Sequence, residues 1–322
     1  MRATRWAGLL GLYVGAQALA LALAQPFRAA GFSSGAGGTS PLGPILLIVA
    51  VIVVPIIIIL LARRQGVLGA LRWVLLLAIG GALFLTLIET LVLLFPQSYL
   101  LPPMGAEIVL VPAIPIATAI SVTLFLALLM EPQWYVVDVA GFVAAAAVIA
   151  ILGGSFAILP CFILLIALAV YDYIAVYRTK HMLRLADIVT EMKLPILMVM
   201  PEEASYDYLA APTLSETRQV PVDERGVMFM GLGDVVIPGV LVVSAFVWLP
   251  ATPVYLGIGA NLWTAIGTLV GSLLGYAVLM RLVLKGNAQA GLPLLNGGAI
   301  AGYLLAFLLA YQTFSFGLTG GL

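Results

Sequence analysis

Long apolar runs recur along the whole chain, and they restrict it to a membrane. A bilayer core about 30 Å thick is crossed by about 20 mostly apolar helical residues, and about nine stretches of this kind are present. They lie near Ala7–Ala24, Pro44–Leu61, Leu71–Leu94, Ile108–Leu129, Val136–Leu152, Ile158–Tyr177, Met228–Trp248, Leu256–Leu282 and Pro293–Phe314. Only 9% of the 322 residues are charged, whereas a soluble domain carries about 25%. The sequence therefore predicts an all-α polytopic membrane protein with about nine transmembrane helices.

Charge balance and residue inventory exclude several classes of function. The 14 Lys and Arg residues equal the 14 Asp and Glu residues in number, which leaves no basic surface for a nucleic-acid backbone. Cys161 is the single cysteine and His181 the single histidine, which excludes a disulfide framework and a His or Cys metal cluster. We therefore expect no nucleic-acid partner, no metal and no cofactor.

The cations predict how the chain is oriented in the cell membrane. With the N-terminus inside, thirteen of the 14 Lys and Arg residues fall in cytoplasmic segments and only Arg28 lies outside, as short cytoplasmic loops require. The first run also ends in small residues, Leu21–Ala24, as a cleaved secretory signal would, but its length favours a membrane span. We predict a six-helix bundle over residues 1–177, a large hydrophilic cytoplasmic loop over 178–227, and a three-helix unit over 228–322.

Two short elements are expected within or beside this loop. His181–Lys193 has the apolar spacing of an interfacial amphipathic helix. Pro195–Pro201 is too short to span a membrane and is predicted to be a strand.

Two aspartates lie inside predicted membrane helices, where an ionisable group costs at least about 2.5 kcal/mol and indicates a functional site. Asp172 lies six residues before Arg178. Asp234 lies nine residues after Arg225. At 1.5 Å per residue, the two carboxylates lie roughly 9 and 13 Å below the same membrane face. Two carboxylates in one apolar site do not both ionise, so one can activate water while the other polarises a peptide carbonyl.

Gly231 and Gly233 precede Asp234 and thin one side of its helix. Another backbone can approach closely there, although small residues also serve helix packing. Packing alone does not explain the two aspartates, because Ser, Thr or Asn would provide a polar contact at lower cost. A proton relay through the same acids stays open. Asp138, near a predicted helix end, is expected to be solvated.

These residues resemble those of the presenilin and signal peptide peptidase family, the GxGD intramembrane aspartyl proteases, and most of all an archaeal presenilin homologue. Tyr171-Asp172 stands in the sixth predicted helix, Gly231-Leu232-Gly233-Asp234 opens the seventh, and Pro293-Leu294-Leu295 opens the ninth. The inside N-terminus favours the presenilin orientation, because signal peptide peptidases are inverted.

The resemblance implies a role for each of these residues. Asp172 and Asp234 would be the catalytic pair. The implied substrate-binding residues are Tyr171, Gly231, Leu232, Gly233, Pro293, Leu294 and Leu295. The family motif in the ninth helix is Pro-Ala-Leu, so Leu replaces Ala here, and a register shifted onto Ala290-Gly291-Leu292-Pro293 is also open.

Single-span transmembrane proteins in the lipid bilayer are the implied substrates. A membrane helix hides its amides in its own hydrogen bonds, so we expect the substrate to unwind and pair with a protease strand. Pro195–Met200 and Val227–Met230 are the candidate strands. Alternatively, Pro195–Met200 merely rests on the membrane surface.

The residue inventory also bears on other classes of function. Serine and zinc proteases are excluded because the only histidine lies in the loop. A prepilin-peptidase-like protease shares the G-x-G-D element but would lack the ninth-helix motif. A proton-coupled transporter or ion leak pathway would use the same two acids, although such folds usually contain inverted repeats and none is evident here.

Overall fold

Eight helices make up most of the described structure. The computed structural model describes residues 2–29, 31, 46, 49, 53, 67–94, 113–179, 196–203, 205–210, 220, 226–283 and 289–318. The helices are α1 (Arg2–Ala29), α3 (Val67–Leu94), α4 (Ala113–Met130), α5 (Trp134–Ser155), α6 (Ile158–Tyr177), α9 (Leu232–Trp248), α10 (Ala260–Val283) and α11 (Leu292–Tyr311). The predicted all-α membrane fold is confirmed. The predicted segments Pro44–Leu61 and His181–Lys193 lie outside the described residues, apart from isolated positions in the first.

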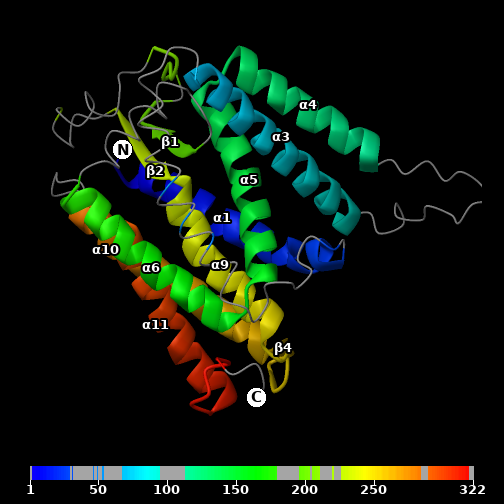
Figure 1. Ribbon diagram of the computed structural model, residues 1–322, viewed down its shortest axis with the longest axis vertical. Helices are drawn as coiled ribbons and strands as arrows, with labels where there is room; N and C mark the ends of the chain where they lie inside the picture. Colours follow the sequence, from blue (N-terminus) through cyan, green and yellow to red (C-terminus); the bar gives the residue numbers. More distant parts are fainter. Residues whose placement is uncertain are drawn as a thin grey trace, which may run out of the picture.

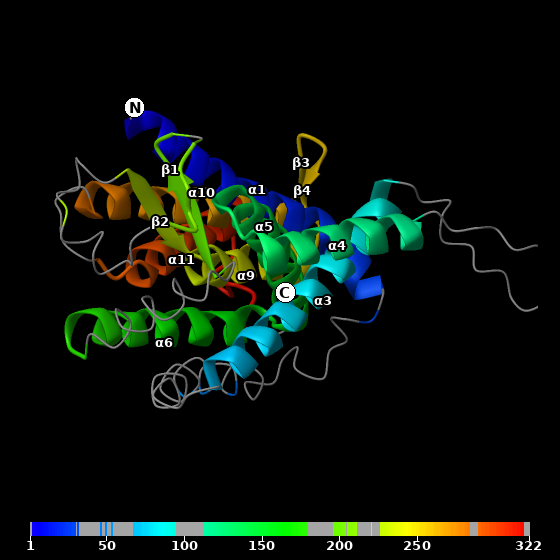
Figure 2. The ribbon, with the colours of Figure 1, turned by 90° about the horizontal axis from the view of Figure 1, so that it is seen from above.

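Within these ranges, six helices are long and apolar enough to cross a bilayer, namely α1, α3, α5, α6, α10 and α11, while α4 and α9 are shorter apolar helices. Helix α9 lies at the centre and packs against α1, α5, α6, α10 and α11. Figures 1 and 2 show α6, α10 and α11 on one side of this core, and α3 and α4 on the other. Since α9 touches helices from both predicted helical units, the two units share one core.

Two strands form an antiparallel ribbon at one end of the helices. β1 (Leu197–Pro201) pairs with β2 (Val227–Gly231), with Val199 opposite Phe229. Both predicted strands are therefore confirmed, and β1 pairs with β2 instead of merely resting on a surface. The predicted helix Met228–Trp248 begins later than expected, because its first residues belong to β2 and α9 starts only at Leu232.

The other end of the molecule carries a small hairpin, formed by β3 (Val254–Tyr255) and β4 (Ile258–Gly259). Figure 1 shows α1 starting near the β1–β2 ribbon and α11 ending near this hairpin. The Tyr255 hydroxyl donates to the Ala310 carbonyl at 3.1 Å, which ties the hairpin to α11. Arg28 also lies at this end, where its guanidinium group donates to the Val247 carbonyl at 3.4 Å.

Helices α10 and α11 pack with their backbones in direct contact. A methyl group built on Gly271 would lie 2.2 Å from the Gly298 carbonyl oxygen, and one built on Gly275 would lie 2.2 Å from the Leu294 carbonyl oxygen. Small residues of this kind allow close helix packing in membranes. Because Leu294 belongs to the predicted Pro-Leu-Leu motif, α10 fixes the position of that motif directly.

Candidate active site

Asp172 lies near the end of α6 that faces the β1–β2 ribbon. Its side chain is only 6% exposed. The Leu292 backbone N–H donates to Asp172 Oδ2 at 3.1 Å, and Gly291 provides a further backbone hydrogen bond to this carboxylate. Asp172 is therefore held by the chain segment that leads into α11.

Asp234 lies in the first turn of α9, directly after β2. Gly231 ends the strand in an extended conformation and caps the helix, so the strand and the helix together set the position of the carboxylate. Negative charge is favoured in the first turn, where the helix dipole is positive. The side chain is partly exposed.

Both carboxylates converge on the same two residues, Gly291 and Leu292. A methyl group built on Gly291 would lie 2.9 Å from Asp234 Oδ1, while the adjacent Leu292 N–H binds Asp172. The two carboxylates are close enough to interact electrostatically. Helices α6 and α9 thus bring together the two aspartates selected from the sequence, and the loop before α11 lies against both.

The predicted substrate-binding residues lie at different distances from these carboxylates. Gly231 is near Asp234, since a methyl group on it would lie 3.4 Å from Asp234 Oδ2. Gly233 is exposed, and a methyl group there would meet nothing within 4 Å. Tyr171 is half-buried beside Asp172, and Leu232 packs partly against the core.

The Pro-Leu-Leu motif begins one residue after the residues nearest the carboxylates. Pro293 stands in the first turn of α11, Leu294 is half-buried and Leu295 is fully buried in the core. Gly291 and Leu292, which border the two aspartates, belong to the shifted register Ala290–Pro293. The substrate-binding roles of Pro293, Leu294 and Leu295 stay predictions.

Two polar residues that the sequence did not single out hold α11 and the segment before it against α6. The Asn296 amide is fully buried and its Nδ2 donates to the Leu165 carbonyl at 2.9 Å. The Tyr177 hydroxyl donates to Gln289 Oε1 at 2.8 Å. An asparagine within an apolar run is a detectable signal, because polar side chains in membrane helices usually bond across helices.

Helix α1 also places buried polar groups near Asp234. Tyr13 and Gln17 are both fully buried, and Tyr13 interacts electrostatically with Asp234. The Tyr13 ring lies 5.6 Å from the ring of Tyr276 on α10. Gln17 within the first apolar run is the signal that would have pointed to this cluster.

The fold and the site define a multi-pass membrane protein with two carboxylates brought together between its helices, the arrangement that an intramembrane aspartyl protease requires. Residues 10–312 match the sequence model of the family described as "Signal-peptide peptidase, presenilin aspartyl protease". The chain belongs to this family and is an aspartic endopeptidase, which decides against the transporter and the prepilin-peptidase-like alternatives.

Solved structures agree with this assignment. A presenilin family intramembrane aspartate protease in a C222 crystal form is 31% identical, with a TM-score of 0.60 over 95% of this chain and 99% of that chain. The same kind of protein in a P2 crystal form is 31% identical, with a TM-score of 0.59 over 94% and 97% of the two chains. No curated protein sequence matches.

Proposed function

We propose that the protein hydrolyses peptide bonds within the transmembrane segments of single-span membrane proteins, with Asp172 and Asp234 as the catalytic pair. The observation that carries this proposal is the convergence of both carboxylates on Gly291 and Leu292. No covalent intermediate and no cofactor are needed, because a carboxylate and a carboxylic acid supply both the base and the acid.

The reaction is amide hydrolysis by one water molecule. The ionised aspartate takes a proton from water as the water oxygen bonds to the peptide carbonyl carbon, while the protonated aspartate donates a hydrogen bond to the carbonyl oxygen. The C–N bond then breaks, a proton passes to the leaving nitrogen, and one carboxylic acid and one amine result. The pair acts as one coupled unit that holds a single proton between two carboxyl groups.

The outer edge of β2 is the proposed docking site for the unwound substrate. The Leu232 N–H donates to the Ile196 carbonyl at 2.9 Å and so points toward β1. In an antiparallel pair, every second residue directs its backbone groups toward the partner strand in this way. The backbone groups that point outward from β2 therefore belong to Val227, Phe229 and Gly231. A substrate strand paired there would reach the flank of Asp234, where exposed Gly233 leaves open space.

The end of the molecule that carries the active site faces the cytoplasm in this proposal, and the protein resides in the cell membrane. The N-terminus and residues 178–227 are then cytoplasmic. Arg178 follows the end of α6, and Arg281 lies in the last turn of α10. Both lie at the same end as the two carboxylates, as the excess of positive charge on cytoplasmic segments requires.

Reconstitution of the purified protein with a single-span substrate tests the catalytic pair. We expect Asp172→Asn and Asp234→Asn each to lower the rate of peptide release by about 100-fold or more, because each removes one partner of the acid–base pair. Glu131→Gln is the matched control, since Glu131 is exposed between α4 and α5. Release that persists at the wild-type rate in either aspartate variant would rule out the pair.

A further inference from the structure

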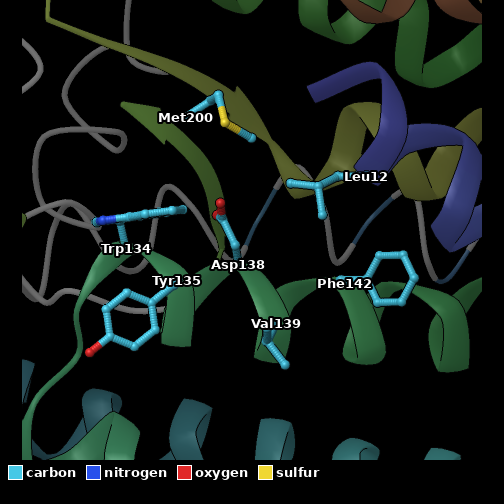
Figure 3. A pocket seen from close by; sticks show the side chains of 7 residues that line it. All are labelled: Leu12, Trp134, Tyr135, Asp138, Val139, Phe142 and Met200. Carbon is cyan, nitrogen blue, oxygen red and sulfur yellow. The ribbon is translucent and has the colours of Figure 1, made fainter. Parts of the chain in front are cut away.

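A third aspartate, Asp138 on α5, is buried and contacts the strand ribbon. Its side chain is only 4% exposed, so the expectation that it is solvated at a helix end is wrong. Asp138 Oδ1 accepts the backbone N–H of Val199 in β1 at 2.7 Å. Its second oxygen, Oδ2, is buried and has no hydrogen-bond partner within the described part of the chain. In Figure 3 the carboxylate points away from the α5 ribbon toward the strands.

This hydrogen bond occupies the outer edge of β1. Val199 lies opposite Phe229, and Phe229 is one of the residues whose backbone groups point outward from the ribbon. The Val199 N–H therefore also points outward, toward α5, and Asp138 accepts it. Two residues further along the same edge, Pro201 has no N–H to offer. β1 is thus closed to a further strand, whereas no hydrogen bond to the outward backbone groups of β2 is present among the described residues.

The same end of α5 holds the loop that follows β1. Gln133 Oε1 accepts the Tyr208 N–H at 3.2 Å, and Gln133 Nε2 donates to Asp207 Oδ1 at 3.2 Å. Helix α5 is therefore hydrogen-bonded to β1 through Asp138 and to the loop after β1 through Gln133.

Side-chain packing does not fix β1 on every side. An open pocket of about 290 Å³ lies beside Asp138, and Leu12, Phe142 and Met200 are among the residues that line it (Figure 3). On the other side, Val199 and Tyr208 pack in a small apolar cluster with Val137. The hydrogen bond from the Val199 N–H to Asp138 is directional, whereas the packing beside it is incomplete. The hydrogen bond therefore sets the position of β1 along α5.

We infer that Asp138 is a positioning residue for substrate docking: it anchors β1 to α5 and closes the outer edge of β1, so that the β2 edge is held in register with Asp234 and receives the substrate strand. This inference rests on the proposed function, because it assumes that an extended substrate pairs with β2 and is cut beside Asp234. Asp138 itself does not touch the reacting atoms.

The test compares steady-state cleavage by full-length variants in reconstituted vesicles, with fragment masses measured by mass spectrometry. Asp138→Leu keeps the size of the side chain but leaves the Val199 N–H without an acceptor. A lost buried hydrogen-bond partner is expected to raise KM by about tenfold, with kcat within about twofold and with cleavage spread over neighbouring peptide bonds. Asp138→Asn keeps the Oδ1 acceptor, so most of the wild-type KM and the single main cleavage position should return.

Ser155→Ala is the matched control, because it removes a side-chain hydrogen bond to the backbone at the far end of α5, from Ser155 Oγ to the Ile151 carbonyl. Val199→Pro deletes the same hydrogen bond from the strand side without breaking a bond to β2, and it should reproduce the rise in KM if Asp138→Leu does not fold. The effects of Asp138→Leu and Val199→Pro on KM should be non-additive when the two substitutions are combined, because both remove the same hydrogen bond.

The inference is overturned if folded Asp138→Leu and Val199→Pro cleave at the wild-type KM and at the wild-type position. It is also overturned if Asp138→Asn behaves like Asp138→Leu, because charge and not the acceptor would then matter. Failure of the proposed function has a separate signature, namely cleavage that persists in Asp172→Asn or Asp234→Asn.

Discussion

The three aspartates of the membrane helices differ in what surrounds them. Asp172 and Asp234 could be selected from the sequence because each interrupts a long apolar run, where an ionisable group is costly. Asp138 could not, because it lies only one turn inside α5, where a charged side chain ordinarily reaches water. Its burial depends on Val199, which is 61 residues further along the chain. No local pattern of apolar residues encodes that contact.

Gly291 provides a sharp test at the level of one residue. Its backbone is helical, with φ −78° and ψ −47°, so alanine fits the backbone there. The added methyl group, however, would lie 2.9 Å from Asp234 Oδ1. We expect Gly291→Ala to lower kcat by about tenfold or more, because it would displace Asp234, which is a catalytic residue in the proposed function, while the thermal midpoint changes little.

Gly297→Ala is the control for this substitution. Gly297 lies in α11, the helix that Gly291 caps, is exposed, and would place a methyl group in open space. It should keep the wild-type kcat and gain about 0.5–1 kcal/mol of stability, as alanine does in a helix interior. Equal kcat values for Gly291→Ala and the wild type, measured on the same substrate, would contradict the close approach.

At the level of elements, the apolar runs predicted most helices but not the point where a strand replaces a helix. Residues Met228–Gly231 continue the apolar run of α9 without a break, so periodicity could not separate the two. Pairing with β1 decides the conformation, and the partner strand precedes it by about 30 residues. The Gly-rich run Leu256–Leu282 predicted the membrane helix that the structure shows as α10. Its close contact with α11 could not be predicted, because it depends on the three-dimensional arrangement of the two helices.

The close packing of α10 on α11 predicts that this helix pair does not tolerate even one added methyl group. Gly271→Ala would place a carbon atom 2.2 Å from a backbone carbonyl oxygen that has no room to move. We expect a loss of about 1–3 kcal/mol, the usual cost of overpacking, seen as a lower thermal midpoint in detergent. Gly81→Ala on α3, where a methyl group meets nothing, should instead raise the midpoint slightly, as alanine does in a helix interior.

At the level of the whole molecule, the distribution of cations agrees with the direction of the helices. The β1–β2 ribbon, both carboxylates and the cations Arg178 and Arg281 lie at one end, whereas Arg28 lies at the other. Arg28 is held there by the Val247 carbonyl and by the Trp248 ring, 5.7 Å away, as an interfacial anchor is. The two ends that the loop cations distinguish in the sequence are therefore the same two ends that the helices define in the structure.

Cysteine labelling in sealed vesicles checks which end faces the cytoplasm. The single native cysteine, Cys161, is fully buried, so the unmodified protein should not react with a membrane-impermeant maleimide. Ser205→Cys is exposed beyond β1, and Thr313→Cys is exposed beyond α11. We expect Ser205→Cys to react only in inside-out vesicles and Thr313→Cys only in right-side-out vesicles, because the excess of positive charge predicts that the end with the two carboxylates is cytoplasmic. The reverse pattern would place the proposed catalytic pair near the outer face, so that substrates would be cut close to their extracellular ends.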